Sequence, residues 1–389
     1  MTVSKLPQPF PRSEYIRRLA AVKSEMARRE IDALIVHDAA NLTYLTGHTG
    51  KATVIPQALV VSLQKEEPTL ILRKMDAPSA HYQTFLEPGS VIAYSEDLIG
   101  NPRADGYDVV IDLLNDFGLA SRGVGLEQST LPPLAVDKFK KRLPKARFVD
   151  GTGLIDWIRI VKSDLEIAIM REAAAITDKA FARAAEVIRP DVREADAAAE
   201  IIGALVRGVN GKAGSDIQNF YMCASPLTGT PHVQWTDGTL RDGSQINLEL
   251  GGKRHHYVVG GMRTFCIGKP SERLRRIHEG EVEGLEAALA NVRPGVTCSD
   301  VANVFYRTLE KHGFKKESRC GYSIGINWLE QTASLRDGDM TELKPNMTFH
   351  MMLGNWVDEE FGYVIGETFR VTESGAEVFT KTPRKLFEI

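Results

Sequence analysis

The feature that most limits the fold is an internal repeat in the second half of the chain. The segment RPDVREADAAAEI, which begins at Arg189, recurs as RPGVTCSDVANVF at Arg293. An Arg, a Pro, a Val, an Asp and an Ala match at one constant offset. In each copy a helical segment precedes the Arg-Pro turn, and a second helical segment and strand-rich sequence follow it. The repeat predicts two similar helix-helix-sheet units that pack as pseudo-twofold halves, with a cleft between them.

The residues before the repeat predict a separate α/β domain. Apolar residues recur at helical spacing between Ser13 and Arg29, and residues 31–37 form a short apolar strand. Strand-like and helical segments continue to alternate as far as Asp150. A chain of 389 residues also exceeds what one hydrophobic core usually serves. We expect two domains, residues 1–155 and residues 156–389.

Charge and cysteine usage exclude several classes of protein. The 48 basic and 51 acidic residues give a formal charge of -3, which predicts no general attraction to nucleic acid or acidic membranes. The four cysteines are widely spaced and form no CxxC pair, as expected for buried thiols in a reducing compartment. The sequence has neither an apolar signal core at its start nor a run of about 18 apolar residues. We expect a soluble cytoplasmic protein with no nucleic-acid or membrane partner.

Two stretches near the C-terminus, Pro231 to Thr264 and Arg319 to Thr368, concentrate the residues that carry chemistry. Both place His, Glu, Tyr and Trp on segments that otherwise resemble strands of a buried sheet. An ionisable group on a buried strand must be paired or must shift its pKa. These stretches are therefore where we expect the functional site.

The order of the domains and a set of motifs resemble the creatinase, aminopeptidase P and prolidase superfamily. The resemblance covers essentially the whole chain, and it implies an α/β creatinase-like N-terminal domain followed by an α+β pita-bread catalytic domain. The motifs are LTYLTGHTG at Leu42, RIVKSDLEI at Arg159, TPHVQW at Thr230, the Arg263-Thr264 pair, GYSIG at Gly321, LKPNMTFHMM at Leu343 and VIGETFRVTESG at Val364.

The metal ligands of the superfamily are missing from this chain. Its peptidases bind two divalent metals through two Asp, one His and two Glu, and the resemblance places Glu249, Gly260, Tyr322, Met352 and Gly366 at those positions. Glycine has no side chain, and Met and Tyr are poor ligands for a hard dinuclear site. We therefore expect no catalytic metal and no cofactor. A peptidase of this type needs the metal to activate water, so Xaa-Pro peptidase activity becomes a minor alternative.

Within the superfamily the chain is more similar to ectoine hydrolase than to creatinase, and both are metal-independent. His232 falls where creatinase has its catalytic His, but two of the creatinase Glu positions hold Met262 and Met352. Ectoine hydrolase opens the cyclic amidine of ectoine to N-acetyl-diaminobutyrate. The residues that match its pattern are His232, Glu249, Tyr322, His350 and Glu367. The segment after GYSIG is shorter here, so the substrate need not be ectoine itself.

The resemblance implies a role for each of these residues in hydrolysing a small amidine or amide. Glu249 and Glu367 would hold the planar cation, and His232 would move the proton between water and the leaving nitrogen. Tyr322 would orient water or stabilise the tetrahedral adduct. The expected substrate-binding residues are His350, which is also a second candidate base, Trp328, Glu330, Trp356 and, from the partner subunit of a homodimer, His48.

Structural roles and other functions remain open at this point. His232 and Tyr322 could simply pack in the core, Glu367 could pair with Arg370, and Arg263 could tie the sheet together. The alternative functions are a creatinase-like amidinohydrolase, an Xaa-Pro metallopeptidase with a non-standard metal set, and a non-catalytic binding protein.

Overall fold

The computed structural model describes residues 5–50 and 55–389, and these divide into two compact units, one ending at Arg159 and the other comprising Ile160–Ile389. The predicted boundary after residue 155 falls inside α6 (Leu154–Arg159). This helix packs on α1 (Arg12–Arg28) and α2 (Ala39–Thr46), and its Asp156 accepts a hydrogen bond from Asn41 at 3.3 Å. The boundary therefore moves to the end of α6, because that helix belongs to the core of the first unit.

The first unit is a six-stranded sheet with helices, as the alternating pattern predicts. The strand order is β4-β3-β2-β1-β5-β6, and β1 pairs antiparallel with β2 and parallel with β5. The strands are β1 (Ala33–Val36), β2 (Ala58–Ser62), β3 (Thr69–Arg73), β4 (Val91–Tyr94), β5 (Gly123–Leu126) and β6 (Arg147–Asp150), and the remaining helices are α3 (Ala77–Gln83), α4 (Gly106–Asp116) and α5 (Pro133–Arg142).

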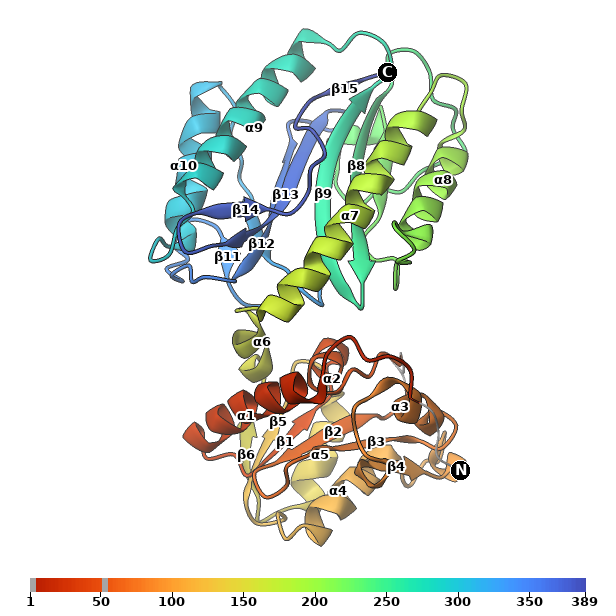
Figure 1. Cartoon of the computed structure of the whole chain (residues 1–389), viewed down its shortest axis with the longest axis vertical. Helices are drawn as coiled ribbons and strands as arrows, with labels where there is room; N and C mark the ends of the chain where they lie inside the picture. Colours follow the sequence, from red (N-terminus) through yellow and green to blue (C-terminus); the bar gives the residue numbers. More distant parts are fainter. Residues whose placement is uncertain (1–4, 51–54) are drawn as a thin grey trace. The chain divides into compact units, whose positions relative to one another are not determined.

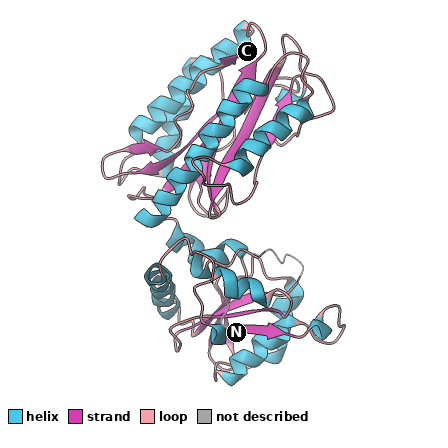
Figure 2. Cartoon of the chain, turned by 45° about the vertical axis from the view of Figure 1, so that its right-hand side comes forward, coloured by secondary structure: helices cyan, strands magenta, loops and turns pink. Residues whose placement is uncertain are grey.

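The second unit is a nine-stranded sheet with helices against one face. The main strand order is β11-β10-β12-β13-β9-β8-β7, with β14 beside β13 and β15 beside β9. Helices α7 and α8 pack on β8, while α9 and α10 pack on the strands of the other half (Figures 1 and 2). The helices are α7 (Asp164–Val187), α8 (Glu194–Arg207), α9 (Glu272–Asn291) and α10 (Cys298–Lys311). The strands are β7 (Tyr221–Ala224), β8 (Gln245–Arg254), β9 (Tyr257–Cys266), β10 (Gly321–Ser323), β11 (Ser334–Leu335), β12 (Thr348–Trp356), β13 (Gly362–Val371), β14 (Ala376–Val378) and β15 (Phe387–Glu388).

The internal repeat is visible in the backbone of this unit. Helices α8 and α10 each have 14 residues, and both their first and their last residues are separated by the offset found in the sequence. The turn before each helix has one left-handed residue, Asp191 at φ 66° and Gly295 at φ 82°. The backbone N–H of each donates to an equivalent carbonyl, that of Leu240 or that of Leu343. The two halves therefore repeat a helix-turn-helix-sheet unit down to individual hydrogen bonds.

The register of the central strands sorts their side chains between two faces. Glu249 pairs with Met262, which in turn pairs with Gly366, so these three residues share one face. Their neighbours along each strand point the other way. Arg263 is one such neighbour, and its guanidinium carbon lies 5.6 Å from the ring centroid of Phe181 on α7. We call the face that carries Glu249 the open face, because the helices cover the opposite one.

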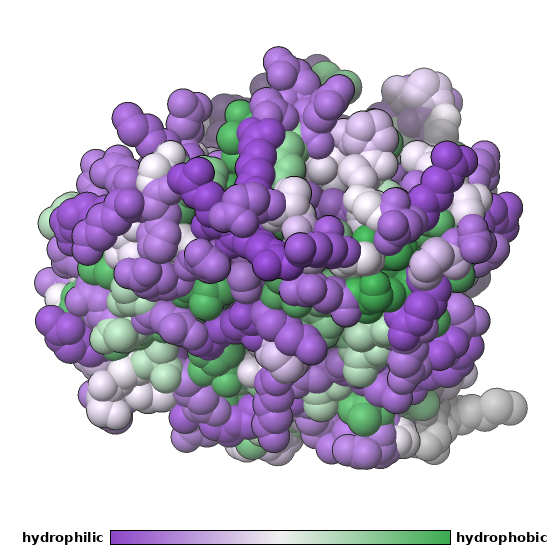
Figure 3. Space-filling view, turned by 90° about the horizontal axis from the view of Figure 1, so that it is seen from above, coloured by the Kyte–Doolittle hydropathy of each residue, from purple (hydrophilic) through white to green (hydrophobic). Residues whose placement is uncertain are grey.

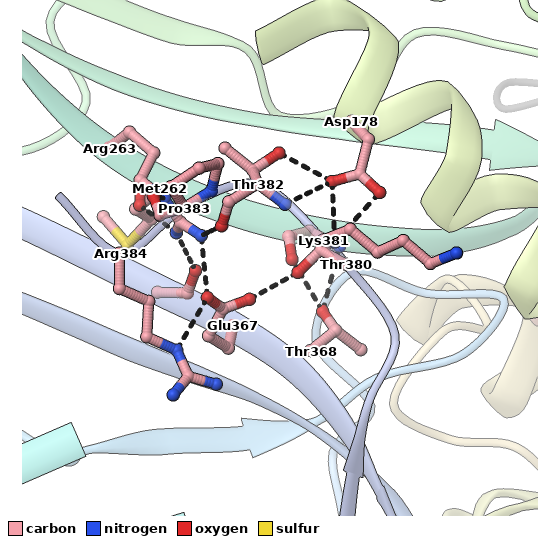
Figure 4. A network of polar contacts seen from close by, with 12 residues as sticks. Asp178, Met262, Arg263, Glu367, Thr368, Thr380, Lys381, Thr382, Pro383 and Arg384 are labelled. Atoms are coloured by element: carbon pink, nitrogen blue, oxygen red, sulfur yellow. Dashed lines mark hydrogen bonds and ion pairs between the residues drawn. The ribbon is translucent and has the colours of Figure 1, made fainter. Parts of the chain in front are cut away.

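On the helix-covered face, Arg263 forms the centre of a polar network (Figure 4). Its guanidinium donates to the backbone carbonyls of Met262, Gly366, Thr382 and Pro383, and to the Glu367 carboxylate at 2.7 Å. All five N–H donors of the side chain are thereby used. One buried cation joins β9 of the first half, β13 of the second half and the C-terminal segment.

The C-terminal segment, residues 380–389, is also fixed to α7. Asp178 on that helix accepts from the backbone N–H groups of Lys381 and Thr382 and from the Thr382 hydroxyl (Figure 4). The Thr380 hydroxyl donates to Glu367. Beyond these contacts, β15 pairs with β9, so the end of the chain crosses the helix-covered face as part of the packed structure.

The surface of the molecule is mainly polar in the view of Figure 3, where apolar side chains occur in small separate groups. Within the described residues, no helix combines the length and the apolar character that crossing a lipid bilayer would require. All four cysteines are free and buried, as the sequence predicts.

We predict that Arg263→Ala lowers the free energy of unfolding of the second unit by about 3–5 kcal/mol, because it leaves the buried Glu367 charge without its partner. Arg171→Ala is the matched control: Arg171 is half exposed and pairs with Glu377, so its loss costs about 0–1 kcal/mol. Urea denaturation followed by circular dichroism measures both. Equal losses for the two variants would show that the Arg263 network does not hold the halves together.

Candidate active site

The open face carries a cluster of ionisable residues from three strands. Tyr322 on β10 pairs with His350 on β12, and the His350 Nε2 lies 3.8 Å from the Glu249 Oε1 on β8. That distance is too long for a direct hydrogen bond. His350 is fully buried, and its Nε2 has no hydrogen-bond partner among the described residues. The histidine therefore presents an unused polar atom towards Glu249.

Trp328 closes the cluster from the loop between β10 and β11. Its indole N–H donates to the Tyr322 hydroxyl at 2.7 Å, and its ring meets His350 edge-on with centroids 5.1 Å apart. The indole lies on two glycines that pair across β8 and β9, Gly251 and Gly260. A Cβ added at either position would come within 2.4 or 2.5 Å of the ring. Only glycine at both positions leaves room for the indole.

Burial and charge both act on the phenol of Tyr322. Burial raises the pKa of Tyr322 well above its usual value, and the nearby Glu249 charge raises it further. The N–H of Trp328 acts in the opposite direction on this pKa, because it stabilises the phenolate, but the effect is smaller. Tyr322 therefore stays protonated at neutral pH and can donate its hydrogen.

A pocket on the open face brings together three predicted site residues: His232, Glu249 and Trp356 line it. His232 lies between β7 and β8 with a left-handed backbone at φ 54°. Its exposed ring lies 5.0 Å from the ring of Tyr221, which pairs with Glu249. The left-handed turn thus directs the imidazole into the pocket that also receives the Glu249 carboxylate. Tyr221 was missed by the sequence analysis, because its role follows from the pairing of β7 with β8.

Trp356 forms another wall of the pocket. It lies at the end of β12, where its indole covers Gly354 and Gly362; a Cβ at either glycine would come within 2.3 or 2.7 Å of the ring. The indole N–H is buried, and no acceptor for it occurs in the part of the chain that the structure describes. Trp356 thus gives the pocket an aromatic wall.

The predicted catalytic role of Glu367 needs correction. Glu367 pairs with Met351 and points to the helix-covered face, away from Glu249. Its carboxylate accepts from Arg263, Arg384 and Thr380. It does not pair with Arg370, which bonds to Glu377 instead. Glu367 is one residue from the former metal position in sequence but on the wrong side of the sheet, so we assign it a structural role.

The predicted substrate contacts of Glu330 and Trp328 are also corrected. Glu330 forms an ion pair with Lys162 at 2.7 Å, and both side chains are 1% exposed. Trp328 is 3% exposed and uses its N–H on Tyr322. Neither residue lines the pocket that contains His232. Both are buried outside this pocket, and the ion pair of Glu330 holds the loop that carries Trp328.

His48 belongs to the first unit. Its side chain is buried, and burial lowers the pKa of its imidazole. The expectation that His48 completes the site of a partner subunit stays a prediction.

The chain is similar to known proteins along its whole length. Residues 168–373 match metallopeptidase family M24, and residues 18–161 match the creatinase/prolidase N-terminal domain. A Sinorhizobium fredii protein, the uncharacterized hydrolase/peptidase y4tL, is 62% identical over 99% of each chain. Ectoine hydrolase from Halomonas elongata is 34% identical over 97% of this chain and 98% of its own. The crystal structure of dipeptidase PepE from Mycobacterium ulcerans has a TM-score of 0.83 and 25% identity, covering 98% of this chain and 99% of its own.

These matches confirm the predicted fold class, a creatinase-like α/β domain followed by a pita-bread domain. They also raise the question whether the open face could hold the metal that the name metallopeptidase implies. No group of three or more His, Cys, Asp or Glu suited to a metal ion occurs among the residues described. The indole of Trp328 fills the space over Gly260, and a Cβ at Gly366 would lie 3.0 Å from the Met262 side chain. The donor set and the filled space therefore do not fit a dinuclear metal site.

We predict that Gly260→Ala destabilises the second unit by about 1–3 kcal/mol, because the new methyl group overlaps the indole of Trp328. Adding Trp328→Leu should remove most of this penalty, so the two substitutions should be strongly non-additive. Gly375→Ala serves as the control, since its Cβ meets only one atom, at 3.7 Å. Denaturation of the single and double variants measures the coupling. Additive effects would mean that the indole does not rest on Gly260.

Proposed function

Because the chain belongs to metallopeptidase family M24, we propose that it is a hydrolase that has replaced the metal chemistry of that family. Its proposed reaction is metal-independent hydrolysis of a non-peptide carbon-nitrogen bond in a small amidine or amide, with ectoine as the first candidate substrate. The observation that carries the proposal is the pocket that His232 and Glu249 line together, in a chain with glycine at two positions that the resemblance equates with metal ligands. The 34% identity to ectoine hydrolase over nearly the whole chain supports the same reaction class.

The pocket suits a planar cation. The Glu249 carboxylate can accept two hydrogen bonds from the N–H groups of an amidinium, and charge-assisted bonds of this kind are stronger than neutral ones. The indole of Trp356 offers a π face to the same pocket. The pocket contains one carboxylate where the sequence analysis expected two, so Glu249 carries the charge recognition alone.

We assign the proton transfer to His232. In the proposed reaction a water oxygen adds to the amidine carbon while the imidazole of His232 takes the water proton. The same imidazole then returns that proton to the leaving nitrogen, and the carbon-nitrogen bond breaks. The exposed position of His232 beside Tyr221 leaves its ring free to accept and donate. Tyr322 on β10 and His350 on β12 do not line this pocket, and the proposed role of the Tyr322 hydroxyl is to stabilise an adduct that forms at the Glu249 carboxylate.

The proposed enzyme acts in the cytoplasm as a homodimer, in which His48 of one subunit contributes to the pocket of the other. Mixed dimers of His48→Ala and His232→Ala subunits test this arrangement. Recovery of part of the activity on mixing would support a shared site, and no recovery would oppose it.

We predict that chelator-treated protein incubated with ectoine produces the acetyl methyl signal of the ring-opened product in proton NMR. The expected rate is unchanged by added EDTA, because the proposed mechanism uses no metal. His232→Ala should abolish the signal, while His81→Ala, a change on α3 of the first unit, should not. Activity that requires added metal would contradict the metal-independent mechanism. Full turnover by His232→Ala would remove His232 from it.

We predict that Glu249→Gln weakens substrate binding by roughly 10- to 150-fold, because it replaces charge-assisted hydrogen bonds worth about 1.5–3 kcal/mol with neutral ones. Isothermal titration of the cationic substrate and of a neutral amide analogue measures the effect. Binding of the neutral analogue should change much less. Glu373→Gln, in an exposed turn, is the control and should bind as the wild type does. If Glu249→Gln lowers the affinity for the cation and for the neutral analogue equally, Glu249 does not recognise the charge of the substrate.

A further inference from the structure

We propose that Trp328 is a positioning residue for the reaction: its indole N–H fixes the Tyr322 hydroxyl so that this hydroxyl donates its proton towards the substrate beside Glu249. The inference rests on the proposed function and deepens it. It assigns a role to a residue that the pocket itself does not expose.

The direction of the hydrogen bond follows from the two groups involved. An indole N–H can only donate, whereas a phenol oxygen can accept and its O–H can donate. In the 2.7 Å contact between them, Trp328 therefore donates and Tyr322 accepts. The O–H of Tyr322 is left for a second acceptor. Tyr322 pairs across the strands with His350, whose Nε2 lies 3.8 Å from the Glu249 carboxylate, so the O–H that Trp328 leaves available belongs to the cluster that contains both groups.

The indole is held firmly enough to set this direction. Gly251 and Gly260 form the flat surface beneath it, and His350 meets its ring. The loop that carries Trp328 is fixed by the buried ion pair of Glu330 with Lys162, and the Glu330 N–H donates to the Ser323 carbonyl. The Gly325 carbonyl accepts from Val258 on β9. Trp328 is thus anchored from both sides of the loop.

The chemistry of the proposed reaction uses such a donor. When water adds to an amidine carbon, the new oxygen needs a hydrogen-bond donor that does not have to reorganise. A freely rotating phenol would spend part of its time donating elsewhere. With its oxygen lone pair engaged by Trp328, the Tyr322 hydroxyl is restricted to the orientation that the adduct requires.

The first test measures the hydrogen bond without any substrate. The chain has four tryptophans, and ¹⁵N labelling of their indoles gives four N–H signals. Trp328→Phe identifies the Trp328 signal. We expect Tyr322→Phe to move that signal upfield and to speed its exchange with solvent, while the signal of Trp157 stays in place. If Tyr322→Phe leaves the position and exchange rate of the Trp328 signal unchanged, the proposed contact is wrong.

The second test measures the role in catalysis. Trp328→Phe keeps an aromatic ring but removes the N–H, so we expect kcat to fall roughly tenfold, the value of one hydrogen bond, with KM little changed. In a Tyr322→Phe background the same substitution should cause no further loss, since Trp328 acts through the hydroxyl. Trp157→Phe, on the half-exposed Trp157 of the first unit, is the matched control.

Each outcome of the second test decides the inference. An unchanged kcat in Trp328→Phe, or an equal loss in the Tyr322→Phe background, would reduce Trp328 to a packing residue. Unfolding midpoints measured for the same variants separate a general loss of stability from the kcat effect. If the wild type hydrolyses no amidine or amide, the proposed function fails and the positioning role falls with it. The indole signals would still show whether the contact exists, so the two failures are distinguishable.

Discussion

The buried ion pair of Arg263 and Glu367 is the interaction on which the second unit depends. The repeat supplies two halves that each bury a helix pair against their own strands, and the halves meet where β9 pairs with β13. Arg263 joins them by donating to both strands and to the C-terminal segment. A buried charge pair need not add stability relative to apolar residues. Its five directed hydrogen bonds instead specify one way of joining the halves, and so they fix the register of the open face.

That register decides which residues can act together. Side chains along a strand point alternately to its two faces. Glu367 points to the helix-covered face, so its neighbours Gly366 and Thr368 belong to the open face. On β9, Arg263 likewise points to the helix-covered face and Met262 to the open face. The polar network under the helices and the pocket on the open face are therefore two sides of the same strands. A shift of one residue in the strand register would turn Glu249 to the helix-covered face and the ion pair of Arg263 with Glu367 to the open face.

Much of the fold could be predicted from the sequence, because periodicity and repetition are local or nearly local signals. The Arg-Pro repeat gave the two halves, and the helix expected at residues 13–29 is α1 within one residue at each end. The resemblance named both His232 and Glu249, and the two residues line one pocket. The face of Glu367 was missed although alternation predicts it, because Glu367 directly follows Gly366 and neighbouring residues of a strand point to opposite faces. The role of Glu330 could not be inferred, because its partner Lys162 lies far away in the sequence.

The arrangement of Trp328 shows why a site that lacks metal ligands cannot simply be left empty. Removing side chains at Gly260 and Gly366 would open space in the interior, and unfilled space costs packing energy. Trp328 fills the first space and Met262 borders the second. A tryptophan fills volume and also supplies one fixed donor, which here meets the phenol of Tyr322. The residue that fills the space over Gly260 thus also holds the phenol of Tyr322 by one directed hydrogen bond, so packing and polar contact depend on each other at this position.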